Sequence, residues 1–164
     1  MPGPAALRAA RKIARECPAL RVRQASRALT RVYDEALRPV GLQMSQFAVL
    51  IAIASFSEAS ATISAVANSL VMDRTTLTRN LRPLERAGLV RIARAQGDAR
   101  ARLVLLTHRG EKAIEQAFPL WENALSRVKS VLGVRKVRLL NVQLAGVVDH
   151  APRLGEASLR AKRQ

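Results

Sequence analysis

The chain has 164 residues, which suits one domain with a modest core, or a small domain with a dimerisation arm. Hydrophobic residues make up 49% and charged residues 24%, a globular balance that argues against wholesale disorder. Lysine and arginine number 28 against 12 aspartate and glutamate, and the formal charge of +16 favours a polyanionic partner over a merely basic protein.

Several site types are disfavoured by what the chain lacks. Cys17 is the only cysteine, which excludes an intramolecular disulfide and predicts a reducing, cytoplasmic location. That thiol with His108 and His150 cannot form a zinc site without carboxylates, so we expect neither metal nor cofactor. The longest apolar run, 47–54, is far shorter than the ~20 residues of a membrane span.

The N-terminal part is expected to be helical and basic. Residues 1–17 form an arm, helical or mobile, whose cations are Arg8, Arg11, Lys12 and Arg15. Pro18 suits the first position of a long helix that Pro39 and Gly41 end. Its apolar stripe is Val22, Ala25, Leu29, Val32 and Ala36. A stripe of this length needs a partner surface, either elsewhere in the chain or on a second subunit.

Three helices follow in close succession. Ser45 can cap a helix that is apolar nearly all round and should be the most buried element. A short helix then carries Ile63, Val66, Ala67 and Leu70 at helical spacing. Asp73 is expected to cap the next helix, from Arg74 to about Ala87, which Gly88 ends and Pro83 should bend.

Two β-rich runs, 89–94 and 102–106, flank a Gly-Asp turn and predict a hairpin. Thr107 can cap a fifth helix that reaches Leu132, stops at Gly133 and is kinked at Pro119. A last helix covers about 134–150, and 151–164 is expected to be a loose basic tail. This chain therefore has the element order of a winged helix-turn-helix, which is a short helix, a tight turn, a second helix and a hairpin.

The second helix of that motif has the composition of a recognition helix. With Leu77, Leu81 and Leu84 inward, its outward face presents three guanidinium groups and two hydroxyls, from Arg74, Thr75, Thr78, Arg79 and Arg82. These groups suit base edges and phosphates in a major groove. The alternative is a solvated face, but Glu85 is its one acid, and solvated helices usually interleave both signs.

The hairpin adds Arg94, Arg100 and Arg102 around its turn. A wing arginine can enter a narrow minor groove beside the recognition helix, where the negative potential is enhanced. Asp98 would then brace Arg100 or Arg102 through a charge-assisted hydrogen bond. An ordinary basic turn is the alternative. Double-stranded DNA is therefore the expected partner.

Segments 73–90, 97–100 and 105–110 resemble the MarR family of regulators. The resemblance runs from about Pro18 to Val148, although His108 and Arg109 replace the usual Pro-Glu-like pair. It implies a mainly α fold with a β-hairpin wing, a DNA-binding lobe over 43–106, and dimerisation helices over 18–42 and 107–150. It also implies a homodimer on a near-palindromic operator, with Arg100 in the minor groove. Such proteins are repressors released by a small anionic or aromatic effector, or by oxidation.

The family's effector pocket lies between the lobe and the dimer helices, where Arg27, Tyr33 or Phe47 could line it. Cys17, at a helix start near Arg15 and Arg21, is a candidate redox residue. A small apolar residue without such a function is the favoured interpretation. No enzyme motif is evident. A non-specific architectural DNA binder is the main alternative function, and a protein of anionic membranes or a scaffold is the third.

Overall fold

The computed structural model describes residues 2–95 and 98–151, with the side chains of 98–100 outside this description. The elements are α1 (Pro4–Glu16), α2 (Pro18–Leu37), η1 (Arg38–Val40), α3 (Met44–Ala54), α4 (Ile63–Ser69), α5 (Arg74–Arg86), β1 (Val90–Ala95), β2 (Asp98–Leu106), α6 (His108–Leu132) and α7 (Val134–Asp149). The expected fold, mainly helical with one β-hairpin, is confirmed. Of the predicted tail, residues 152–164 lie outside the described part.

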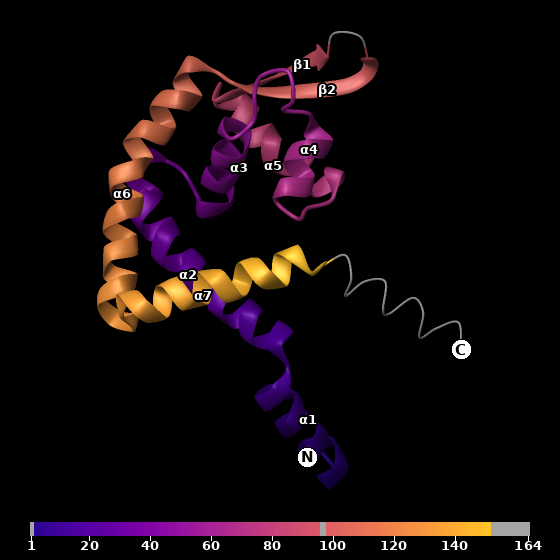
Figure 1. The fold of residues 1–164 in the computed structure, drawn as a ribbon, viewed down its shortest axis with the longest axis vertical. Coiled ribbons are helices and arrows are strands. Elements are labelled where there is room, and N and C mark those ends of the chain that lie inside the picture. The colour runs from indigo at the N-terminus through magenta and orange to yellow at the C-terminus, as the bar shows by residue number, and fades with distance from the viewer. Residues whose placement is uncertain (1, 96–97, 152–164) are drawn as a thin grey trace.

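The molecule has two parts (Figure 1). We call α3, α4, α5 and the hairpin the winged lobe, and α2, α6 and α7 the helical arm, which is distinct from the N-terminal segment 1–17. Helices α3, α4 and α5 gather beneath the hairpin, and α6 leads away from this lobe toward α7. Helix α1, which the sequence left as a helix or a mobile segment, is a helix at the end of the molecule opposite the hairpin. The positioning of the candidate site therefore depends on the lobe and on its junction with α6.

Local signals place most helix ends. Pro18 begins α2, and Gly41 and Gly88 both have a φ of 68°, a left-handed conformation that glycine adopts without strain. The expected cap of α3 is wrong, because Gln43 rather than Ser45 precedes the first helical residue. The Gln43 N–H donates to the Gln46 side chain at 2.9 Å, and the Met44 N–H donates to Asp34 at 2.6 Å. A contact from a residue ten positions earlier thus fixes this helix start.

The core of the lobe is built from leucines and valines that converge from the end of α2 and from α3, α4, α5 and the hairpin. The largest fully buried side chains are Leu37, Leu50, Leu77, Leu81, Leu84, Val49, Val66 and Val104. Helix α3 contributes four buried side chains, but it is not buried all round, since Ile51 is 40% exposed. One side of α3 therefore faces open space rather than the core.

The arm leaves much apolar surface uncovered by its own chain. In α2 only Leu37 is buried, and Val22 is 42% exposed. Val131 and Val134, at the junction of α6 and α7, are 83% and 66% exposed. Among the described residues, no single helix is both long and apolar enough to cross a membrane. Only Pro18–Val40 and Met44–Ala54 together reach that length and composition, and they are bent by 78°.

Candidate nucleic-acid interface

The helix-turn-helix consists of α4, a short turn and α5. Thr62 caps α4 by accepting a hydrogen bond from the Ala65 N–H at 3.0 Å. Asp73 caps α5, accepting from the Thr76 N–H at 2.8 Å and from its hydroxyl at 2.6 Å. The Thr76 side chain and backbone both lower the pKa of Asp73, so this cap is a carboxylate at neutral pH. The predicted start of α5 is confirmed.

The burial of α5 decides which of its side chains face outward. Leu77, Leu81 and Leu84 are at most 1% exposed, as predicted. Arg74, Thr75, Arg79 and Arg82 are exposed on the outer surface of the lobe, whereas Thr78 is half-buried. The Thr78 hydroxyl donates to the Arg74 carbonyl at 2.7 Å, so its proton is engaged within the helix. Three guanidinium groups and the exposed Thr75 hydroxyl thus dominate this face.

The hairpin brings two further arginines together. Its antiparallel register pairs Arg94 with Arg102, and a bulge follows at Ala95. Both side chains are exposed, and like charges directly opposite each other destabilise a hairpin unless an anion lies nearby. Neither ion pair that the described residues form involves α5 or the hairpin. Asp98 and Arg100 lie on β2, but their side chains are outside the described part, so the bracing contact stays a prediction.

The sequence analysis missed two cationic residues in this region. Arg91 on β1 and Arg86 in the last turn of α5 are both exposed. The alternation Val90, Arg91, Ile92 could have indicated the first, because residues alternate between the two faces of a strand.

Backbone hydrogen bonds connect the hairpin to the helix-turn-helix. The Val104 N–H donates to the Ala61 carbonyl at 2.8 Å, and Thr62 pairs with Leu103 in an isolated bridge. The Leu89 N–H donates to the Leu84 carbonyl at 2.9 Å, which ties the start of the hairpin to the end of α5. The cationic side chains of α5 and of the hairpin are therefore held in a fixed relation, as a surface that must match a rigid duplex requires.

The MarR family profile matches residues 40–101 of this winged lobe. The transcriptional regulator MosR of M. tuberculosis, solved in complex with DNA, is 37% identical, over 85% of this chain and 98% of MosR, with a TM-score of 0.73. The chain belongs to the MarR family.

Members of this family are transcriptional regulators and not enzymes. A mutant MarR from E. coli, complexed with operator DNA, is 25% identical, over 83% of this chain and 96% of that chain, with a TM-score of 0.71. CouR of Rhodococcus jostii RHA1, bound to p-coumaroyl-CoA, shares the fold at 20% identity, over 81% and 92% of the chains, with a TM-score of 0.68. No functionally curated protein sequence matches the chain.

The winged lobe joins the arm at the start of α6. Thr107 caps this helix as predicted, accepting from the Gly110 N–H at 3.1 Å. The Thr107 hydroxyl also donates to the Gly88 carbonyl at 2.7 Å. The backbone N–H of Thr107 donates to the Leu89 carbonyl at 3.1 Å. Gly110 lies so close to Leu89 that a Cβ there would clash with the Leu89 carbonyl oxygen. A change in the direction of α6 must therefore move the base of the hairpin.

An apolar cavity of about 610 Å³ opens between α3, the end of α4 and α6. Of the three predicted effector residues, Phe47 lines it. Arg27 is exposed on α2 and Tyr33 is half-buried, which raises the pKa of its phenol, but neither is among the described residues lining the cavity. The sequence analysis missed Ile51, Phe118 and Trp121, because α3 and α6 are far apart in the chain. Phe118 is 50% exposed here.

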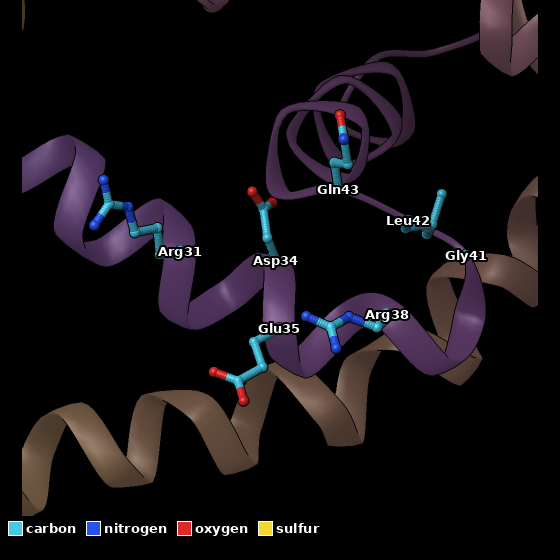
Figure 2. A pocket seen from close by; sticks show the side chains of 7 residues that line it. All are labelled: Arg31, Asp34, Glu35, Arg38, Gly41, Leu42 and Gln43. Atoms are coloured by element: carbon cyan, nitrogen blue, oxygen red, sulfur yellow. The ribbon is translucent and has the colours of Figure 1, made fainter.

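A second, polar cavity of about 530 Å³ lies where α2 turns into α3 (Figure 2). Its lining residues are Arg31, Asp34, Glu35, Arg38, Gly41, Leu42 and Gln43. Figure 2 shows the Asp34 carboxylate on α2 beside Gln43 at the start of α3, while Glu35 points away from it. Because Asp34 already accepts the Met44 N–H, we interpret this cavity as part of the structural contact between α2 and α3.

Cys17 lies between α1 and α2 and is half-buried. Its N–H donates to the Ile13 carbonyl at 2.9 Å, which continues the hydrogen bonding of α1. Its proposed redox chemistry stays a prediction. The part of the chain that the structure describes contains no group of three or more His, Cys, Asp or Glu side chains that could hold a metal.

Proposed function

We propose that this MarR-family protein is a sequence-specific repressor that binds a pseudo-palindromic operator as a homodimer. The observation that carries the proposal is the cationic surface formed by α5 and the hairpin. On it Arg74, Thr75 and Arg79 extend from the first turns of α5, the part of a recognition helix that contacts base edges. Arg82, Arg94 and Arg102 are also exposed and suit phosphate oxygens.

The proposed dimer rests on the uncovered apolar surface of the arm. A groove of about 530 Å³ between α2, α6 and α7 is lined by Ala25, Leu29, Val32, Val128, Val131 and Leu140, among others. Val131 in this groove and Val134 at the start of α7 are both largely exposed, which favours a second copy of the chain as the cover of this surface. Such a dimer spaces two recognition helices about one DNA turn apart, roughly 34 Å. Light scattering should give twice the 17.9 kDa of one chain.

We further propose that a small molecule releases the operator by binding in the cavity between α3 and α6. CouR, which shares the fold, is bound to p-coumaroyl-CoA in its solved structure. In this chain the cavity lies between the lobe and the arm, so a ligand there contacts both parts. Ligand and operator must then weaken each other's binding by the same factor, typically 5–150-fold.

Selection of bound fragments from a random duplex pool tests the proposed function. A repressor should enrich one pseudo-palindromic sequence and bind it about 10³–10⁷ times more tightly than bulk DNA. The +16 charge also suits an architectural protein, which would bind all fragments with similar affinity. A flat affinity distribution would therefore refute the repressor proposal and support the architectural alternative.

A further inference from the structure

We infer that α1 carries a second DNA-binding site, which binds the phosphate backbone of a duplex other than the one held by the winged lobe. The site is the face of α1 formed by Arg8, Arg11, Lys12 and Arg15, which we call the α1 cationic face. A protein that uses both sites joins two DNA segments. This inference goes beyond the proposed repressor function, because the second site requires no operator sequence.

The first observation is the distribution of charge along the chain. Residues 43–106, which include the winged lobe, contain eight cationic and four acidic residues, so they account for only +4 of the total charge of +16. Residues 1–33 contain eight cationic residues and a single acid, Glu16. A duplex on the lobe therefore leaves most of the excess charge without a partner. Surface charge of this density attracts polyanions.

The second observation is that α1 gathers its cations on one side. Arg8, Arg11, Lys12 and Arg15 follow each other at the spacing i, i+3, i+4 and i+7, which places them on one helix face. All four are exposed, and no residue of α1 is buried. Arg15 donates to Glu16 at 2.7 Å, and the other three form no ion pair within the described part of the chain. Like charges at these spacings destabilise a helix, so a bound polyanion would stabilise α1.

The α1 cationic face has the dimensions of a DNA backbone. From residue 8 to residue 15 the helix rises by about 10 Å, at ~1.5 Å per residue. One strand of B-DNA presents about three phosphates over this length. The guanidinium groups of Arg8 and Arg11 suit bidentate contacts with phosphate oxygens, and Lys12 adds a point charge. Such contacts hold a duplex without reading its sequence.

The position of α1 separates it from the duplex on the lobe. Figure 1 shows α1 at the end of the molecule opposite the hairpin. Leu37, the last residue of α2, belongs to the core of the lobe, and the 20 residues of α2 span about 30 Å before α1 is reached. At physiological salt, exposed charges attract over only about 8–10 Å. We therefore assign the α1 cationic face to a second duplex.

An anionic membrane is the other polyanion that a basic helix can bind. Helices that lie on membranes bury Trp, Phe or Leu side chains along their apolar face. In α1 the only large aliphatic side chains are Leu7 and Ile13, which are 41% and 57% exposed, and alanines occupy the rest of that face. The α1 helix thus offers a full cationic face and little apolar area. This balance favours DNA.

Capture of a second duplex tests the inference. We would immobilise the selected operator in excess over the full-length protein, so that the winged lobes are occupied. A fluorescent duplex of unrelated sequence is then titrated, starting from about 50 mM salt. The wild type should capture it with an affinity that falls log-linearly with salt. Replacing Arg8, Arg11 and Lys12 together by glutamine should weaken capture at least about tenfold and reduce the salt slope by about three, since each phosphate contact contributes about one. No capture by the wild type would overturn the inference.

A matched variant tests the location. Arg135→Gln, Lys136→Gln and Arg138→Gln together remove the same charge from exposed positions of α7, where the spacing spreads the three cations around the helix. This variant should capture the second duplex as the wild type does. Equal loss of capture in both variants would attribute it to bulk charge and overturn the inference. Both should retain the wild-type circular dichroism, light scattering and operator affinity. A loss of operator affinity in the α1 variant would assign α1 to the operator duplex, which would also overturn it.

Failure of the wild type to bind any selected duplex would refute the repressor proposal without deciding this inference. The second site is then measured in an Arg74→Ala and Arg79→Ala variant, whose lobe is impaired. Its remaining affinity for unrelated duplex should fall at least about tenfold when the three α1 changes are added. Binding to vesicles of phosphatidylcholine and phosphatidylserine that requires the α1 cations, without capture of duplex, would overturn the assignment to DNA.

Discussion

Replacing Gly110 by alanine should destabilise the junction between the arm and the winged lobe. A Cβ at this position would clash with the Leu89 carbonyl oxygen, and it would lie 3.1 Å from the carbonyl carbon and 3.2 Å from Leu106 Cδ2. The nearest contact is with backbone, which cannot rotate away as a side chain can. Either α6 or the base of the hairpin must shift, and the hydrogen bonds that Thr107 makes to both will stretch.

The expected cost follows from two contributions. Overpacking a close contact costs about 1–3 kcal/mol. Weakening one hydrogen bond at Thr107 adds about 1 kcal/mol. We therefore expect Gly110→Ala to lower the free energy of unfolding by roughly 2–4 kcal/mol. For a chain of this size that corresponds to a melting temperature lower by roughly 5–15 °C.

Thermal and urea denaturation at one fixed protein concentration measure this loss. Gly146→Ala is the matched control, because a Cβ at this position in α7 meets nothing within 4 Å in the chain. An alanine in a helix interior should stabilise by about 0.5–1 kcal/mol relative to glycine. If Gly110→Ala is as stable as the wild type, the close packing of α6 against Leu89 is wrong. If both variants lose the same stability, the effect is not specific to the junction.

Four further predictions concern the interface and the thiol. Arg79→Ala and Arg100→Ala should each weaken operator binding by about 1–3 kcal/mol in a mobility-shift titration, whereas Lys112→Ala on α6 should not; equal effects would mean that the DNA face is misassigned. Operator affinity should fall steeply and log-linearly with salt, and a slope near zero would contradict phosphate contacts. Asp73→Ala should lower the melting temperature at neutral pH. Hydrogen bonds from Thr76 lower the pKa of this carboxylate in the folded state, so its stabilisation is present above the unfolded pKa and lost as the pH falls through the folded one. The difference between wild type and variant should therefore vanish in acid. Peroxide should abolish operator binding of the wild type but not of Cys17→Ser if the thiol is a sensor, and identical responses of the two proteins would exclude that role.

Elements whose signals are local can be predicted from the amino-acid sequence. The spacing of Leu77, Leu81 and Leu84 selected the buried face of α5, and hence the cationic face. Asp73 and Thr107 identified two helix starts, since a capping side chain bonds to a backbone N–H only three residues away. The resemblance of segments 73–90, 97–100 and 105–110 was enough to identify the family.

Contacts between segments far apart in the chain could not be predicted in this way. Asp34 on α2 accepts the Met44 N–H at the start of α3, a contact that the residues around the expected cap, Ser45, do not indicate. The cavity is lined by Phe47 from α3 and Trp121 from α6, whereas the third aromatic residue considered, Tyr33, is not among its described lining residues. Hydrophobic periodicity shows which face of one helix is apolar. It does not show which second helix packs against that face or how much of the face is covered. The direction of α6 determines this packing, and the close contact of Gly110 with Leu89 fixes that direction.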